Sequence, residues 1–285
     1  MDNSNLKFKI ENLKFEKSPA TRFINFGASS LLGINFLFFI FVGGCAVQKR
    51  VCPPVKSAIE AKNLLNENAV KIKPFRATGD CTISYVNGKD EKFGQSFPVR
   101  MWYIDNQKFC FYGDVGFDPK GLSFAVSDGL YWVYVKPMRV FVKGAVNTAG
   151  KDYFSNPTLL VDFLRPVESD CKISVSKNVM MCKDRQSGKQ KNVFIDSCGG
   201  VAEKIEYFER DAKPFLVVEA EKYEKVKDAN FIFPNKLFYE YHDNKNGRNQ
   251  MEIKFDSVKL WEPSPQQVKA LFTPPEMTEN KKETK

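Results

Sequence analysis

Apolar and polar residues alternate with a period of two over most of the chain between residues 76 and 260. Such alternation is typical of β-strands that bury one face. Short turns such as Asp105-Asn106, Asp118 to Gly121 and Asp128-Gly129 join many of these segments, which favours antiparallel pairing because parallel strands need long crossovers. The predicted strands are 76–86, 95–104, 108–116, 121–127, 130–136, 138–146, 171–176, 179–184, 191–197, 202–210, 214–223, 229–241 and 250–260. The pattern predicts a mainly β fold, a large antiparallel sheet that curls into an unclosed β-barrel.

Three short segments have helical spacing instead. Residues 57–70 begin with Ser57 and carry Glu60 three residues later, the pattern of a capping box, and their alanines and leucines fall on one face. Residues 264–271 are predicted as a last helix that follows Ser264 as its cap.

The third helical segment, residues 156–165, has Asn156 as a cap and Pro157 at its first position. It interrupts the strand pattern, and we expect it to cover the apolar face of the sheet together with the helix at 57–70. The apolar stripe of this predicted lid comprises Leu159, Leu160, Phe163 and Leu164.

Alternation along the strands also predicts which side chains face inward, because a curled sheet directs one face of every strand to its concave side. The opposite positions, such as Glu252 and Lys254, are polar, so one face is expected to be apolar and the other wet. Residues predicted to line an acyl-chain site on the concave face are Val99, Met101, Tyr103, Leu122, Phe124, Val126, Leu237, Tyr239, Met251, Ile253 and Phe255. The alternative is a core that its own side chains fill completely.

The N-terminal residues follow another pattern. Five Lys or Arg residues up to Arg22 are followed by no charge until Lys49, and the stretch between them contains an apolar run from Leu31 to Val42. This arrangement predicts a secretory signal, with an uncleaved transmembrane anchor as the alternative. Removal of residues 1–44 from the 285-residue chain leaves 241 residues, enough for one large β domain.

The end of the apolar run, Val42-Gly43-Gly44-Cys45, resembles the lipobox of bacterial lipoproteins. The resemblance implies that Cys45 receives the lipid and becomes the first residue of the mature chain. It also implies anchoring in the cell envelope, at the outer membrane facing the periplasm. The expected organisation is a signal at 1–44, a tether at 45–56, one domain at 57–275 and a disordered tail at 276–285.

The chain has seven cysteines, and lipidation of Cys45 would leave six. An even number in an exported protein favours disulfides, although sequence alone does not fix their connectivity. We expect at least one disulfide within the group Cys171, Cys182 and Cys198, where Cys182 and Cys198 flank the same predicted hairpin. A metal site is disfavoured because the chain contains no C-x-x-C pair and only one histidine.

Charge and motifs point away from nucleic acid and from catalysis. The net charge of +9 is spread along the chain without a run of five like charges, so no nucleic-acid partner is expected. The single histidine, His242, precedes a predicted turn, and the sequence has neither a G-x-S-x-G elbow nor a phosphate-binding glycine loop. We therefore predict that the protein is not an enzyme and carries no cofactor.

Residues 97–135 pair an arginine-bearing aromatic strand with strands rich in large apolar residues, and later come Phe233-Pro234-Asn235 and Leu271-Phe272-Thr273-Pro274. In this order of elements the chain resembles the LolA/LolB-like lipoprotein-carrier superfamily, closest to its outer-membrane lipoprotein branch, LolB. The resemblance implies a half-barrel with a helical lid that binds acyl chains of lipids or lipoproteins. It also implies a membrane-contact loop at 116–121 carrying Phe117, which could otherwise be an ordinary residue at a strand end.

Three functions remain open at this point. The chain could accept or carry an acyl chain, with the membrane lipid at Cys45 as a second partner. It could be a sensory or interaction protein that binds another envelope protein. It could also be a structural lipoprotein with a filled core.

Overall fold

The computed structural model describes residues 52–86, 92–116, 118–146, 157–167, 170–174, 178–183, 190–208, 213–242 and 248–275. All of them belong to one compact unit, Lys49–Lys285. The predicted signal, Cys45, Phe117 and the tail at 276–285 lie outside the described residues. No helix within the described ranges combines the length and the apolarity that a membrane crossing requires.

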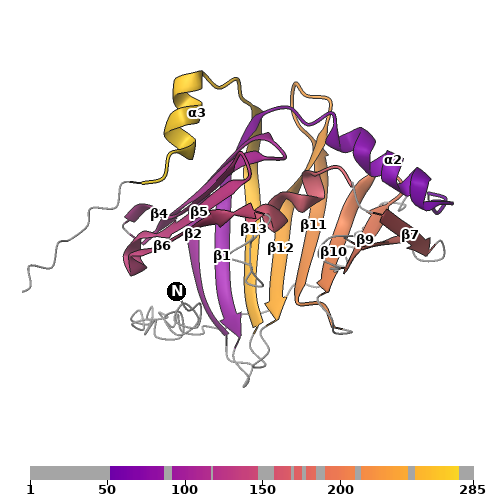
Figure 1. Ribbon diagram of the computed structural model, residues 1–285, viewed down its shortest axis with the longest axis horizontal. Helices are drawn as coiled ribbons and strands as arrows, with labels where there is room; N and C mark the ends of the chain where they lie inside the picture. The colour runs from indigo at the N-terminus through magenta and orange to yellow at the C-terminus, as the bar shows by residue number, and fades with distance from the viewer. Residues whose placement is uncertain are drawn as a thin grey trace, which may run out of the picture. The chain divides into compact units, whose positions relative to one another are not determined.

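Thirteen strands form one sheet in the order β6-β5-β4-β3-β2-β1-β13-β12-β11-β10-β9-β8-β7 (Figure 1). The strands are β1 (Phe75–Val86), β2 (Lys92–Asp105), β3 (Lys108–Val115), β4 (Asp118–Ser127), β5 (Leu130–Val135), β6 (Val140–Ala145), β7 (Asp170–Ser174), β8 (Val179–Lys183), β9 (Gln190–Asp196), β10 (Val201–Phe208), β11 (Leu216–Lys225), β12 (Ile232–His242) and β13 (Arg248–Leu260). Every neighbouring pair is antiparallel.

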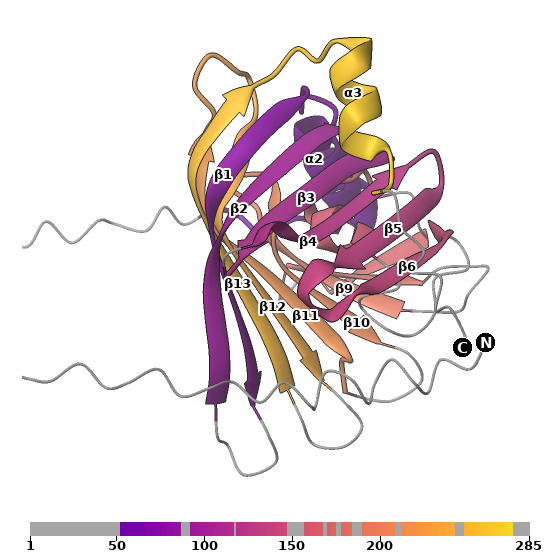
Figure 2. The same ribbon diagram turned by 90° about the vertical axis from the view of Figure 1, so that its left-hand side faces the viewer.

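The topology consists of two meanders, β1–β6 and β7–β13, joined where the first strand pairs with the last. The sheet curls into a half-barrel (Figure 2), and the strand order places β6 and β7 at its two edges. The prediction of a curled, unclosed antiparallel sheet is therefore confirmed.

Turn chemistry accounts for part of this register. Asp128 and Gly129 both have positive φ, 53° and 76°, which is the backbone that a tight two-residue hairpin requires. The predicted turn at Asp118 to Gly121 is wrong, because β4 already begins at Asp118. The chain instead reverses at Gly116, where φ is +61°.

Side chains on the concave side form the main core, which extends from β5 across to β8. On β3, for example, Phe109 and Phe111 face this core, whereas Cys110 and Tyr112 face outward. The inward positions of β12 and β13 follow the predicted alternation, with Leu237 and Ile253 almost completely buried.

The outer face of the sheet is not wet throughout, which corrects the sequence-based expectation. An outer cluster packs there around Cys110, Tyr112, Ala125 and Trp132. It is covered by helix α3 (Pro265–Phe272), which packs against β3 and β4 (Figure 2). The Tyr112 hydroxyl donates to the backbone carbonyl of Leu271 at 2.6 Å, and the Trp132 indole donates to that of Phe272 at 3.1 Å. Alternation failed here because both faces of β2–β5 carry aromatic residues.

Helix α2 (Ala58–Ala69) covers the other end of the sheet, against β7 and β10. The Ser57 hydroxyl accepts a hydrogen bond from the Glu60 backbone at 3.1 Å, as predicted. The capping box is only half formed, because the Glu60 carboxylate accepts from the backbone of Lys56 instead of Ser57. Ala61 and Leu65 form the buried face of the helix.

The predicted lid is the 3₁₀ helix η4 (Pro157–Leu164), which lies between the two meanders in sequence and contacts β4 and β10. Its buried residues are Thr158, Val161 and Leu164. This spacing of three matches the 3₁₀ helix, in which residues i and i+3 lie above one another. The predicted stripe assumed α-helical spacing and therefore missed Val161, while the cap Asn156 lies outside the described residues.

Two disulfides join cysteines of the described residues. The edge disulfide joins Cys171 of β7 to Cys182 of β8, which confirms the expected bridge within the second-half cysteines. Cys198 does not pair with Cys182, since it forms the tether disulfide with Cys52. Cys81 and Cys110 are buried free thiols.

Candidate functional site

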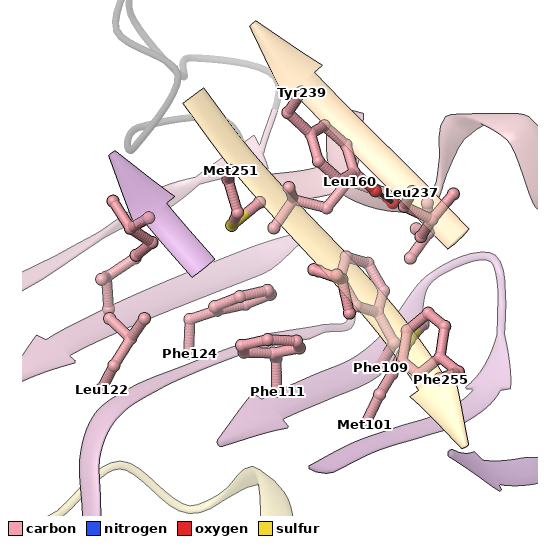
Figure 3. Close-up of a pocket in the computed structure, with 14 residues that line it drawn as sticks. Met101, Phe109, Phe111, Leu122, Phe124, Leu160, Leu237, Tyr239, Met251 and Phe255 are labelled. Carbon is pink, nitrogen blue, oxygen red and sulfur yellow. Dashed lines mark hydrogen bonds between the residues drawn. The ribbon is translucent and has the colours of Figure 1, made fainter. Parts of the chain in front are cut away.

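An apolar cavity lies between η4 and the concave face of the sheet (Figure 3). Its volume is about 40 Å³. Its lining residues are Ile83, Met101, Phe109, Phe111, Leu122, Phe124, Val133, Leu160, Val161, Leu237, Tyr239, Met251, Ile253 and Phe255. The only hydroxyl in this lining belongs to Tyr239, and it donates to the backbone carbonyl of Leu160 at 2.6 Å. The cavity therefore offers dry apolar contact and no reactive group.

Eight of the eleven residues predicted from alternation line this cavity. These are Met101, Leu122, Phe124, Leu237, Tyr239, Met251, Ile253 and Phe255. The other three, Val99, Tyr103 and Val126, are buried in the same core but do not line the cavity. Of the predicted lid residues, Leu160 lines it, Leu164 is buried, and Leu159 and Phe163 pack against the core.

Five lining residues were not predicted: Ile83, Phe109, Phe111, Val133 and Val161. The signal for Phe111 was available in the strand pattern. It pairs directly with Met101 on β2 and with Phe124 on β4, both of which had been assigned to the concave face. Val161 could be found only by assuming 3₁₀ spacing.

Aromatic packing keeps the cavity small. Phe111 and Phe124 stack with their ring centroids 5.2 Å apart (Figure 3), and Phe109 meets Phe124 edge to face at 6.1 Å. A cavity that holds one benzene molecule measures about 150 Å³, so the present space accommodates less than one ring. A longer guest requires that η4 or these side chains move.

Polar contacts hold η4 in place on the β9–β12 side. Asp162 of η4 accepts from the Lys191 ammonium and from the Tyr207 hydroxyl, each at 2.7 Å. Burial by itself would raise the pKa of the Asp162 carboxyl, but Lys191 and Tyr207 outweigh burial and lower it below its ordinary value. The same burial and the neighbouring carboxylate raise the pKa of Tyr207 well above its ordinary value.

The cavity lining does not include the side chains of Cys81, Cys110 and His242, which could take part in catalysis. Burial raises the pKa of the Cys81 and Cys110 thiols to about 12, so both are protonated at neutral pH. His242 ends β12, where its Nε2 lies 3.1 Å from a carboxylate oxygen of Glu240. Within the ranges that the structure describes, no three His, Cys, Asp or Glu side chains gather as a metal site would need.

Comparison with known proteins identifies the fold. No family model matches the sequence, and no curated protein matches it as a relative. A domain described as an outer membrane lipoprotein-sorting protein, from Vibrio parahaemolyticus, superposes with a TM-score of 0.51 at 11% identity, covering 73% of this chain and 96% of that one. A LolA superfamily protein from Nitrosomonas europaea gives a TM-score of 0.48 at 10% identity over 72% of this chain and 96% of that one.

Proposed function

We propose that this chain, which has a LolA/LolB-like fold, is an envelope lipoprotein that binds one acyl chain of a lipid or lipoprotein between η4 and the concave face. The observation that carries the proposal is the apolar cavity beneath a short helix that lies between the two meanders in sequence. Binding of an acyl chain needs only dry apolar area, at roughly 25 cal/mol for each Å² buried. The absence of reactive groups from the cavity lining is consistent with a carrier.

The proposal requires an opening step. The present cavity of about 40 Å³ is far below the ~300 Å³ of typical ligand pockets. The acyl chain would therefore enter the cavity when η4 moves away from the sheet and the rings of Phe111 and Phe124 separate. The hydrogen bond from Tyr239 to Leu160 and the Asp162 contacts oppose this opening.

The small cavity also favours a second candidate, a structural envelope protein whose core is filled by its own side chains. The two candidates differ in one measurable property. A carrier purified under mild conditions retains or takes up an apolar ligand, whereas a filled core does not.

Binding of a fluorescent fatty acid to the purified full chain tests the proposal. Phe124 is 7% exposed and lines the cavity, so Phe124→Glu should abolish binding. The matched control is Leu130→Glu on β5, where the leucine is 62% exposed and the same change should have no effect. If the wild-type chain binds no fatty acid, the structural candidate replaces the carrier.

Because Phe124→Glu could also unfold the chain, a second variant fills the cavity without adding charge. Leu237→Phe should weaken binding while keeping the cooperative unfolding transition. Unchanged affinity in both variants, with intact folds, would exclude this face as the site.

The membrane attachment is a separate part of the proposal. Cys45 would carry the lipid anchor, and the Phe117 loop would touch a membrane surface. Metabolic labelling with a fatty acid should mark the wild-type chain and not Cys45→Ser. Label retained in the variant would disprove anchoring at this cysteine.

A further inference from the structure

A second, more polar pocket is lined by residues of η4, α2 and the strands β9 and β10. It combines apolar residues of α2 and of the two strands with the charged side chains of Asp162, Arg165 and Lys191. Its volume is about 20 Å³, which is room for one or two oxygen-sized atoms and not for a hydrocarbon chain. We call it the headgroup pocket.

The charges in the headgroup pocket do not balance. The one carboxylate of the pocket, Asp162, faces two cations, because the charges of Lys191 and Arg165 both lower its pKa. Lys191 and Tyr207 occupy it at 2.7 Å, so the three charged side chains of the pocket carry a net charge of +1. The guanidinium of Arg165, on a half-buried residue, has no hydrogen bond or ion pair with any side chain in the described ranges. A guanidinium has five N–H donors in a planar fork that matches a carboxylate or phosphate. A half-buried fork that no described side chain pairs with can accept an oxyanion from outside the chain.

The headgroup pocket lies next to the apolar cavity along the lid. Val161 lines the cavity, and Arg165 follows four residues later, immediately after the last residue of η4. A 3₁₀ helix rises about 2 Å per residue, so the two positions are about 8 Å apart along the helix. The positive charge of Arg165 also reaches Tyr103 and Tyr207, where it opposes the rise of their pKa values that burial causes.

We propose that Arg165 binds the anionic headgroup, a carboxylate or a phosphate, of a lipid whose chain occupies the apolar cavity. This inference rests on the proposed function and narrows its ligand class. An anionic lipid would gain a charge-assisted contact that an uncharged acylated molecule lacks. The protein would therefore select lipids by the charge of their headgroup as well as by the length of their acyl chain.

Paired ligands that differ only in charge test the inference. Radiolabelled palmitate and hexadecanol share the same chain, and so do a dipalmitoyl phosphatidic acid and the matching diacylglycerol. The purified full chain should bind each anionic member at least about tenfold more tightly than its neutral counterpart. Preference in the first pair alone identifies a carboxylate ligand, and preference in the second pair alone identifies a phosphate ligand.

Arg165→Gln should remove this preference while the affinity for hexadecanol stays unchanged, and Arg165→Lys should restore part of it. The matched control is Arg139→Gln, which removes the same charge from an exposed site in the turn before β6. Urea unfolding confirms that each variant folds.

The possible failures are distinguishable. If the wild-type chain binds charged and neutral members equally, the headgroup pocket has no such role and the carrier function stands. Equal loss of both ligands in Arg165→Gln would mean that the arginine supports the lid and not the headgroup. If the wild-type chain binds neither member of either pair, the proposed function fails and this inference fails with it.

Discussion

Removal of the Lys191 side-chain charge should destabilise the protein through the lid. Lys191 and Asp162 are 20% and 14% exposed, so the pair is largely screened from water. In Lys191→Met the Asp162 carboxylate keeps the Tyr207 hydroxyl but loses its ammonium partner. Removing one partner of a buried ion pair lowers the free energy of unfolding by about 3–5 kcal/mol. Because this pair is still partly exposed, we expect a loss of roughly 2–4 kcal/mol at pH 7.

The stability loss caused by Lys191→Met should depend on pH. In the wild-type chain the pKa of Asp162 lies below its ordinary value of 3.8, so its stabilising effect is complete above about pH 4 and is lost as the pH falls through the folded-state pKa. Without Lys191, only the Tyr207 hydrogen bond and the Arg165 charge oppose burial, so the pKa of Asp162 should rise. The carboxyl can then take up a proton as the pH falls, so the cost of Lys191→Met should be smaller at pH 4.5 than at pH 7.

Urea unfolding followed by tryptophan fluorescence at both pH values measures these costs. Lys204→Met is the matched control, because Lys204 lies on the neighbouring strand and its ammonium pairs with Glu206 at 2.7 Å instead of with Asp162. Its loss should cost at most about 1 kcal/mol. A cost below about 0.5 kcal/mol for Lys191→Met at pH 7, or a cost that does not change with pH, would refute the reasoning.

Three further outcomes are expected. Loss of the tether disulfide, which closes a loop of 146 residues, should lower the free energy of unfolding by about 5 kcal/mol. Loss of the edge disulfide, with its loop of 11 residues, should lower it by about 3 kcal/mol. Denaturant titrations of the double alanine variants measure both losses, and the reverse order would contradict the loop-entropy argument. Among the six cysteines after Cys45, only Cys81 and Cys110 should react with a thiol reagent in unreduced denatured protein, and neither should react at pH 8 in native protein because burial raises their pKa to about 12. Trp132→Phe removes the indole donor to Phe272 and should cost about 1 kcal/mol while exposing α3 to limited proteolysis; an unchanged cleavage rate would show that α3 is held by other contacts.

Local rules explain why the strands and helix caps could be predicted. The alternation in β13, where Met251, Ile253 and Phe255 face inward, depends only on the two-residue period of an extended chain. The cap of α3 is similarly local, since Ser264 and Gln267 form a complete capping box within four residues. The pairing of β1 with β13 is not local, because their hydrogen bonds join segments at opposite ends of the domain.

The candidate site was predictable only in part for the same reason. Alternation assigned Phe124 and Tyr239 to the concave face, but the lining around them depends on where η4 lies across the sheet. The 3₁₀ spacing of η4 and the contact of Asp162 with Lys191 and Tyr207 arise from tertiary packing between segments that are far apart in sequence.

The sequence by itself therefore determined the curled antiparallel sheet and most of its inward-facing residues, because backbone geometry imposes those periods on any chain. Only the tertiary structure decided the partners of Cys171 and Cys198, the outer cluster beneath α3 and the size of the cavity. These features depend on distances between elements and on how their side chains share space. A one-dimensional pattern carries no such distances, so it predicted an apolar face without showing how nearly that face is filled.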